Sequence, residues 1–187
     1  MLDTNNSQPY QKIEMISGVE IIMMSPPFSN HNVVKDNILY IFRNLLKGNV
    51  CRPYGDNMKV VLEPDSYVVP DFFILCDKSK RKQDGIHGAP DLVVEVLSPS
   101  TTKMDRGEKK ELYQRSGIKE YWLVDPNAKI IEVYLLKDLS YVLHSVYRIP
   151  SEHESPEDIN EEPSEFQVHS FGGLMVKLSD VFEDVLI

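Results

Sequence analysis

The segment Asp91–Leu97 (DLVVEVL) constrains the fold most strongly, because it predicts a strand with apolar side chains on both faces. Successive side chains of a strand point to opposite faces. A strand with Val or Leu on both faces is typical of the centre of a sheet. Glu95 interrupts this apolar run, and a buried carboxylate is costly unless it is paired or binds a metal. The segment therefore predicts a central strand whose glutamate needs a partner.

A second predicted strand, residues 68–75, carries a comparable acid. The side chains on one of its faces are Val69, Asp71, Phe73 and Leu75. Asp71 is the polar exception on this face. Two such acids on strands that can be neighbours suggest a site for a divalent metal, because hard cations prefer carboxylate oxygens. We therefore predict that Asp71 and Glu95 bind Mg²⁺ or Mn²⁺.

The rest of the pattern predicts an α/β (α+β) mixed sheet flanked by two helices. The first helix is expected over Ser29–Leu46, with Ser29 as N-cap and Gly48 at its end. The second is expected from about Lys103 to Ser116. Further strands are expected at 13–24 (a pair), 58–63, 120–124, 129–136, 140–148 and 166–176, with a short helix at 178–186. We expect one domain over residues 1–187, with a flexible lead-in at 1–11 and loops at 76–90 and 151–165.

The second helix presents a lysine on its apolar side. At about 100° per residue, one stripe of this helix contains Asp105, Lys109, Leu112, Tyr113 and Ser116. Leu112 and Tyr113 must face the sheet, which draws Lys109 inward toward Asp71 or Glu95. An ion pair with Asp105, four residues earlier, is an equally weighted alternative on the helix surface. His31, near the start of the first helix, is a polar first-turn residue on helix geometry alone.

Composition and charge exclude several classes of protein. The chain has 187 residues, enough for a core, and no apolar run approaches the roughly 20 residues of a membrane span. The polar N-terminus lacks the layout of a signal peptide, so we expect a cytoplasmic protein without a membrane partner. Cys51 and Cys76 are 25 positions apart with no CxxC motif, and we expect both to be reduced.

The net charge of −9 argues against a nucleic-acid partner only on average. Residues 151–165 hold seven acids and no Lys or Arg, and without them the charge is −2. Residues 77–119 hold ten basic residues against seven acids. The local charge therefore permits an anionic substrate, and the acidic segment is expected to be a solvated loop.

Several motifs resemble one family. They are Pro70-Asp71, the run from Asp91 to Thr101, the run from Asp105 to Tyr113, and the run from Gly117 to Pro126. Glu14, the segment Met24–Pro27 before His31, and Phe171–Phe182 match as well. Together they resemble the bacterial Uma-two family of restriction endonucleases, within the PD-(D/E)xK nuclease superfamily.

The resemblance implies a restriction-endonuclease-like core with a Mg²⁺ site at one sheet edge. Asp71 and Glu95 correspond to the motif acids, but Leu97 stands where the motif has its lysine. A lysine moved onto the next helix would replace it, and Lys109 fits that position. Glu14 and His31 also match the family pattern, as a possible third acidic ligand and a contact to phosphate or water. Tyr113 is expected to pack, with its hydroxyl in a hydrogen bond.

We therefore expect a Mg²⁺-dependent endonuclease that cleaves DNA. The residues expected to contact phosphates are Lys78, Lys80, Arg81, Lys82, Lys103, Arg106 and Lys110. A homodimer is expected, because cutting both strands often needs two symmetric sites. The alternative is a nuclease-fold protein that binds nucleic acid or protein without cutting it, which Leu97 and the negative charge favour. In that case the basic residues only solvate a loop and a helix face.

Overall fold

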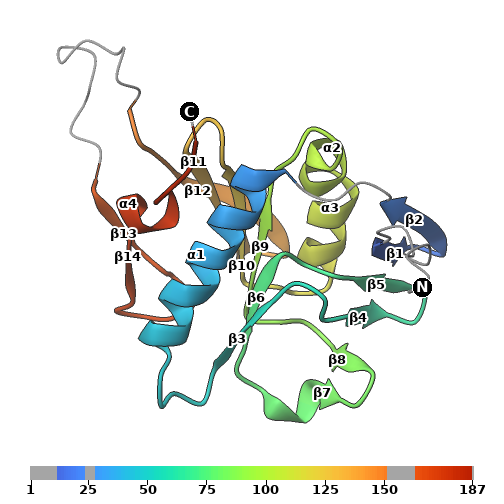
Figure 1. Ribbon diagram of the computed structural model, residues 1–187. Helices are drawn as coiled ribbons and strands as arrows, with labels where there is room; N and C mark the ends of the chain where they lie inside the picture. Colours follow the sequence, from blue (N-terminus) through green and yellow to red (C-terminus); the bar gives the residue numbers. More distant parts are fainter. Residues whose placement is uncertain (1–11, 24–27, 151–162, 187) are drawn as a thin grey trace, which may run out of the picture.

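The structure is a computed structural model that describes residues 12–23, 28–150 and 163–186. Two sheets and four helices dominate these residues (Figure 1). The main sheet has the order β12-β11-β10-β9-β6-β3. Its strands are β3 (Arg52–Gly55), β6 (Phe72–Leu75), β9 (Leu92–Val96), β10 (Glu120–Asp125), β11 (Ile130–Lys137) and β12 (Ser140–Arg148). The fold is therefore of the mixed α+β class that the sequence predicts.

The central strand is β9, as its apolar run predicts. It runs parallel to β10 and antiparallel to β6, and all five of its residues are buried. Phe72 pairs with Val94 in the β6–β9 register. The next step of that register brings Asp71 opposite Glu95, at the point where β6 begins. The pairing of these two strands therefore creates the acidic pair.

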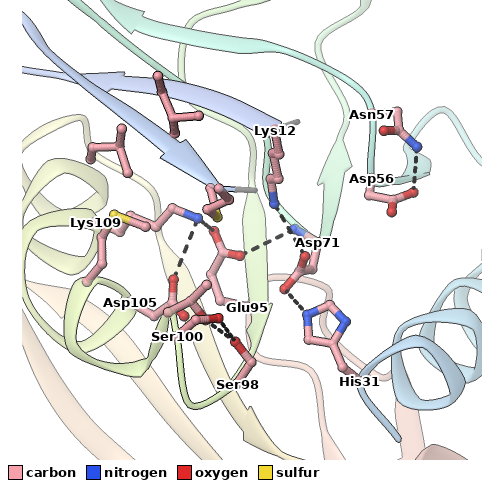
Figure 2. Close-up of a pocket in the computed structure, with 15 residues that line it drawn as sticks. Lys12, His31, Asp56, Asn57, Asp71, Glu95, Ser98, Ser100, Asp105 and Lys109 are labelled. Carbon is pink, nitrogen blue, oxygen red and sulfur yellow. Dashed lines mark hydrogen bonds and ion pairs between the residues drawn. The ribbon is translucent and has the colours of Figure 1, made fainter. Parts of the chain in front are cut away.

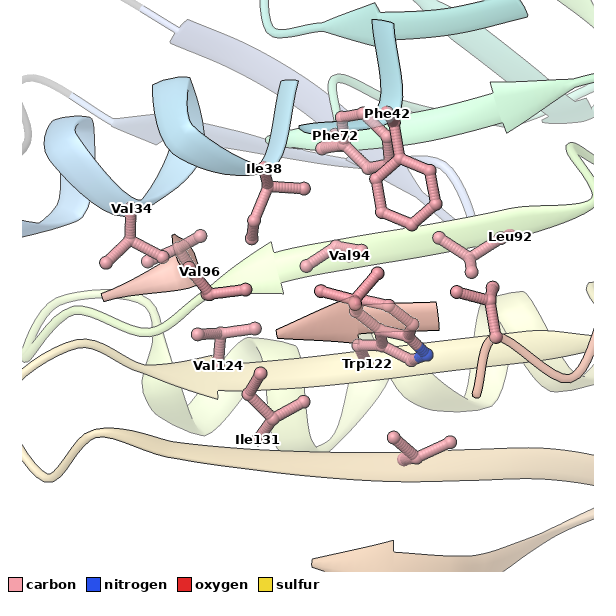
Figure 3. Close-up of a cluster of buried hydrophobic side chains, with 14 of the residues drawn as sticks. Val34, Ile38, Phe42, Phe72, Leu92, Val94, Val96, Trp122, Val124 and Ile131 are labelled. Carbon is pink, nitrogen blue, oxygen red and sulfur yellow. The ribbon is translucent and has the colours of Figure 1, made fainter. Parts of the chain in front are cut away.

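One face of the main sheet is covered by α1 (Ser29–Leu45). Its buried residues Val34, Ile38 and Phe42 recur at helical spacing and pack on the sheet, where Trp122 fills the centre (Figure 3). The Phe42 and Trp122 rings lie 5.9 Å apart. Phe28, rather than the expected Ser29, precedes the helix, and no side chain caps it.

The other face is covered by α2 (Thr102–Arg106) and α3 (Glu108–Arg115). The prediction of one continuous helix is wrong, because Gly107 adopts φ −110° and ψ −102° and separates the two. Leu112 and Tyr113 of α3 are fully buried in a second core, as their stripe predicts.

A second six-stranded sheet, in the order β2-β1-β5-β4-β8-β7, stands beside α3 (Figure 1). Its strands are β1 (Lys12–Ile16), β2 (Val19–Met23), β4 (Val60–Glu63), β5 (Ser66–Val68), β7 (Arg81–Lys82) and β8 (Gly85–His87). The predicted central mixed sheet flanked by helices is thus accompanied by a second sheet, and the expectation of a loop at 76–90 is wrong, because η1 (Lys78–Lys80), β7 and β8 lie there. The segment 68–75 breaks at 69–71, so that its first part belongs to the second sheet and its last part to the main sheet. The segment 76–90 contains η1 followed by a short hairpin. Local sequence pattern shows neither feature.

The C-terminal part also differs from expectation. The prediction of one strand over residues 166–176 is wrong, because they contribute to a hairpin of β13 (Glu165–Gln167) and β14 (Met175–Lys177). The turn at Phe171–Leu174 reverses the chain between them. The closing helix α4 (Leu178–Val181) is shorter than predicted.

The expectation of reduced cysteines is wrong in this structure, where Cys51 and Cys76 form a disulfide. Cys51 precedes β3 and Cys76 follows β6, and the antiparallel register Arg52↔Leu75 places the two cysteines opposite each other. A separation of 25 residues gives no hint of this pairing, because it depends on strand pairing.

Three predicted features lie wholly or largely outside the described residues. They are the lead-in at 1–11, the break at Ser25–Pro27, and most of the acidic segment 151–165. Within the described residues, no helix combines the length and the apolar character needed to cross a membrane.

Candidate active site

Asp71 and Glu95 lie side by side where β6 and β9 meet, as the sequence predicts. The backbone N–H of Asp71 donates to Glu95 Oε2 at 3.4 Å, and that of Val96 donates to Asp71 Oδ2 at 2.9 Å. Both acids are buried, with 6% of Asp71 and 1% of Glu95 exposed. Both carboxylates are therefore buried and accept hydrogen bonds from the backbone where the two strands pair.

Lys109 of α3 reaches this pair from the side of the second core (Figure 2). Its Nζ lies 2.9 Å from Glu95 Oε1, 3.1 Å from Glu14 Oε2 and 3.6 Å from Asp105 Oδ1. The sequence left open whether Lys109 turns inward or pairs with Asp105 on the surface. The structure turns it inward, and Asp105 is buried with it.

Glu14 and Tyr113 complete the surroundings of Glu95. Glu14, on β1, is fully buried, and its Oε1 accepts the backbone N–H of Val69 at 2.8 Å. The hydroxyl of Tyr113 donates to Glu95 Oε1 at 2.5 Å. Tyr113 thus packs and forms a hydrogen bond, as expected, and its partner is the central acid.

His31 contacts Asp71, which helix geometry alone did not indicate. Its Nε2 lies 3.1 Å from Asp71 Oδ2, and the ring is buried. Its Nδ1 is buried without a hydrogen-bond partner among the described residues. The first turn of α1 therefore brings the imidazole into the site because α1 crosses the sheet beside β6.

Sequence reasoning missed two residues of this site, Lys12 and Asp105. Lys12 Nζ lies 3.5 Å from Asp71 Oδ1. The signal that could have found it is strand alternation, since Lys12 shares a face of β1 with the buried Glu14. The sequence indicated Asp105 only as a surface partner of Lys109, although it lies on the same inward stripe.

These side chains surround a cavity of about 290 Å³. The site residues that line it are Lys12, His31, Asp71, Glu95, Asp105 and Lys109. The other lining residues are Ile21, Ile22, Met23, Asp56, Asn57, Ser98, Ser100, Thr101 and Met104. Segments far apart in the sequence, from β1 to α3, therefore meet around one pocket (Figure 2).

The site holds more negative than positive side chains. Around the cavity, Glu14, Asp71, Glu95 and Asp105 face two lysines. Burial raises the pKa of Glu95 to about 8; Lys109 opposes this rise and Asp71 adds to it. Burial also raises the pKa of Asp105. Asp71 differs, because Lys12 and the hydrogen bond from His31 outweigh burial and hold its pKa well below its usual range.

The donor set fits Mg²⁺ or Mn²⁺. Within the described residues, no group of three or more His, Cys, Asp or Glu side chains is arranged as a ready-made metal cage. Mg²⁺ does not need one, since it commonly binds one or two carboxylates and keeps several waters. Among the residues that the structure describes, Asp71 Oδ1 and Glu95 Oε2 each have only a long protein contact, at 3.5 Å and 3.4 Å. Both oxygens therefore retain lone pairs for a cation, which the excess of carboxylates would favour.

The structure does not bring the expected phosphate-contacting residues to this cavity. Lys78, Lys80, Arg81 and Lys82 lie on η1 and β7, at the opposite end of the second sheet from β1 (Figure 1). Lys80 donates to the carbonyl of Ala89 at 2.8 Å.

The helix residues of the same set are nearer but engaged elsewhere. Arg106 forms an ion pair with Glu132 at 2.6 Å. Lys110 Nζ lies 3.5 Å from the centre of the Tyr134 ring. Lys103, on α2, is exposed.

Comparison with known proteins assigns the chain to a family. Residues 2–167 match the Uma2 family, described as "Putative restriction endonuclease". The chain therefore belongs to the Uma2 family, whose description places it among restriction-endonuclease-like nucleases.

Two proteins of Synechocystis sp. (strain PCC 6803) are similar in sequence. The protein slr1290 is 34% identical over 130 residues, which is 68% of each chain. The protein sll1609 is 27% identical over 131 residues, which is 68% of this chain and 73% of its own. A crystal structure of a "putative nuclease belonging to DUF820" from Anabaena variabilis has a similar fold, with a TM-score of 0.65 and 20% identity over 93% of this chain and 91% of that one.

Proposed function

We propose that this protein is a Mg²⁺-dependent endonuclease that hydrolyses phosphodiester bonds in DNA. The observation that carries the proposal is the juxtaposition of Asp71 and Glu95, with Lys109 bound to Glu95, in the wall of one cavity. This combination of two carboxylates and an ammonium group suits phosphodiester hydrolysis. Membership of the Uma2 family supports the same reaction class.

Each residue has a role that follows from its contacts. Asp71 and Glu95 would hold the cation, which when bound activates water and neutralises charge on the phosphate. Lys109 favours the ionised form of Glu95 and so partly opposes the effect of burial, which raises the pKa of this carboxyl. Tyr113 and Glu14 orient Glu95 and Lys109. His31 orients Asp71, and its unpartnered Nδ1 can contact water or a phosphate oxygen.

The DNA partner and a homodimer remain part of the proposal. The exposed basic residues of η1, β7 and α2 would contact phosphates distant from the cut, because they lie outside the cavity wall. Two copies related by a twofold axis would place one site on each strand of a duplex.

Calorimetric titration of Mn²⁺, with and without a short duplex, tests the metal site. Wild-type protein should bind Mn²⁺, and D71N and E95Q should each weaken binding more than tenfold, because each removes a ligand charge. Asp84→Asn is the matched control, since Asp84 is exposed, pairs with His87 and does not line the cavity. If D71N and E95Q bind Mn²⁺ as the wild type does, the carboxylate site is refuted. Cleavage assays on mixed DNA substrates then follow for the proteins that bind.

One observation favours a second candidate, a protein that binds nucleic acid or protein without cutting. Leu97 stands two residues after Glu95 and is buried in the second core, so no lysine is supplied from that position. Mn²⁺ binding that D71N abolishes, together with no cleavage of any DNA substrate, would favour this candidate.

A further inference from the structure

The two lysines of the cavity are held very differently. Only 2% of the Lys109 side chain is exposed, against 16% of Lys12. An ammonium group has three N–H donors, and three carboxylates surround Lys109 Nζ at 2.9 to 3.6 Å. Lys109 donates a hydrogen bond to Glu95 Oε1 and is held by ion pairs with Glu14 and Asp105, so its buried ammonium is less accessible to a substrate than that of Lys12.

Lys12 retains its donors. Its contacts are two ion pairs, with Asp71 Oδ1 at 3.5 Å and with Glu14 Oε1 at 4.0 Å. Both distances exceed the 2.7–3.2 Å of a well-formed hydrogen bond. Among the described residues, the ammonium of Lys12 is thus attracted to the site electrostatically without being fixed by a short hydrogen bond.

The position of Lys12 is set by the strand that carries it. Lys12 pairs with Met23 in the β1–β2 hairpin, so its backbone is fixed at the rim of the cavity. Its side chain points toward Asp71, which lies between Lys12 and His31 in Figure 2. Asp71 Oδ2 is occupied by Val96 N–H and His31, whereas Oδ1 faces Lys12. A phosphate bound beside Oδ1 of Asp71 would therefore lie next to the Lys12 ammonium.

We propose that Lys12 is the catalytic lysine that contacts the scissile phosphate. Its Nζ donates a charge-assisted hydrogen bond to a non-bridging phosphate oxygen and stabilises the negative charge that develops there. Lys109 is then a positioning residue, the buried counter-charge of Glu95, Glu14 and Asp105. The hydrolysis itself rests on the proposed function, but contact between Lys12 and a phosphate group does not.

The test compares Lys12→Gln and Lys12→Arg with the wild type and with Lys59→Gln. Lys59 is the matched control, because its Nζ lies over the Tyr67 ring in the same sheet and does not line the cavity. The probes are Mn²⁺, thymidine 5′-monophosphate with and without Mn²⁺, and bis(p-nitrophenyl) phosphate as a substrate without base sequence. Calorimetry measures binding, and absorbance measures hydrolysis.

Lys12→Gln should weaken thymidine 5′-monophosphate about 10- to 100-fold, the range expected for one charge-assisted hydrogen bond. It should lower kcat and leave Mn²⁺ affinity equal or higher, because a positive charge beside Asp71 is removed. Lys12→Arg should recover part of both losses, and Lys59→Gln should behave as the wild type. If Lys12 only supported the structure of the site, its replacement would weaken the binding of thymidine 5′-monophosphate and of Mn²⁺ together.

Three results would overturn the assignment. They are wild-type phosphate affinity and kcat in Lys12→Gln, loss of Mn²⁺ binding in that variant, and no binding of thymidine 5′-monophosphate by the wild type. If the wild type binds the monophosphate through Lys12 but hydrolyses no phosphodiester, the proposed nuclease function fails and the Lys12 contact stands.

Discussion

Glu95 lies at the centre of the candidate site, in contact with Lys109, Tyr113 and Asp71. Its Oε1 accepts from both Lys109 Nζ and the Tyr113 hydroxyl, and its Oε2 accepts from the Asp71 backbone N–H. Burial favours the protonated form of the carboxyl, which Lys109 only partly opposes, so its pKa rises to about 8. The fraction of Glu95 that is ionised therefore changes with pH around a pKa of about 8.

This gives a pH prediction for cation binding. In the metal-free protein below pH about 8, Glu95 holds a proton that a cation must displace. Mn²⁺ affinity should therefore rise with pH up to about 8 and then level off, with release of about one proton at pH 7. Calorimetry in buffers of different ionisation enthalpy counts that proton. Release of the same number of protons by E95Q would assign the titration to another group.

At the scale of elements, the short hairpin of β7 and β8 depends on one backbone contact. Gly85 has φ +142°, and a Cβ at this position would lie 2.5 Å from the Lys59 carbonyl oxygen. The N–H of Ile86 donates to that same carbonyl at 2.8 Å, which joins β8 to β4. Only glycine allows the two strands to approach this closely.

We predict that Gly85→Ala lowers the free energy of unfolding by about 2 kcal/mol or more, because strain and overlap add. Gly117→Ala is the matched control. Gly117 also has positive φ, at +81°, but a Cβ added there would meet no atom within 4 Å, so its cost should be about 1 kcal/mol. Urea unfolding measures both. Equal losses in the two variants would contradict the described contact, and Mn²⁺ affinity should be unchanged in either.

At the scale of the whole molecule, the disulfide joins the ends of β3 and β6 at the edge of the main sheet. It closes a loop that includes β4 and β5, and so ties the second sheet to the first. Cross-linking a loop of this size stabilises a protein chiefly by restricting the unfolded chain.

We predict that reduction lowers the free energy of unfolding by about 3 kcal/mol for the 25-residue separation. Denaturant unfolding with and without dithiothreitol measures the difference. The double variant Cys51→Ser/Cys76→Ser should resemble the reduced wild type and should not respond to dithiothreitol. If reductant leaves the wild type unchanged, the two cysteines are not joined in solution.

The sequence by itself determined the central strand, the inward face of α3 and the two acids on inward strand faces, which the pairing of β6 with β9 then brings together. These follow from local periodicity, because alternation on 91–97 and helical spacing at 109–113 do not depend on distant partners. It also showed that Asp71 and Glu95 need partners, because a buried charge is costly in any fold. Lys109 and Tyr113 are among those partners, as Glu95 requires.

The tertiary structure alone decided the rest of the site. His31 and Lys12 reach Asp71 because α1 and β1 approach β6 from opposite sides, and no local pattern encodes that approach. The second sheet and the Cys51–Cys76 bond likewise arise from pairing between segments distant in the sequence. Long-range pairing depends on the whole chain packing at once, whereas strand and helix faces are properties of a few consecutive residues.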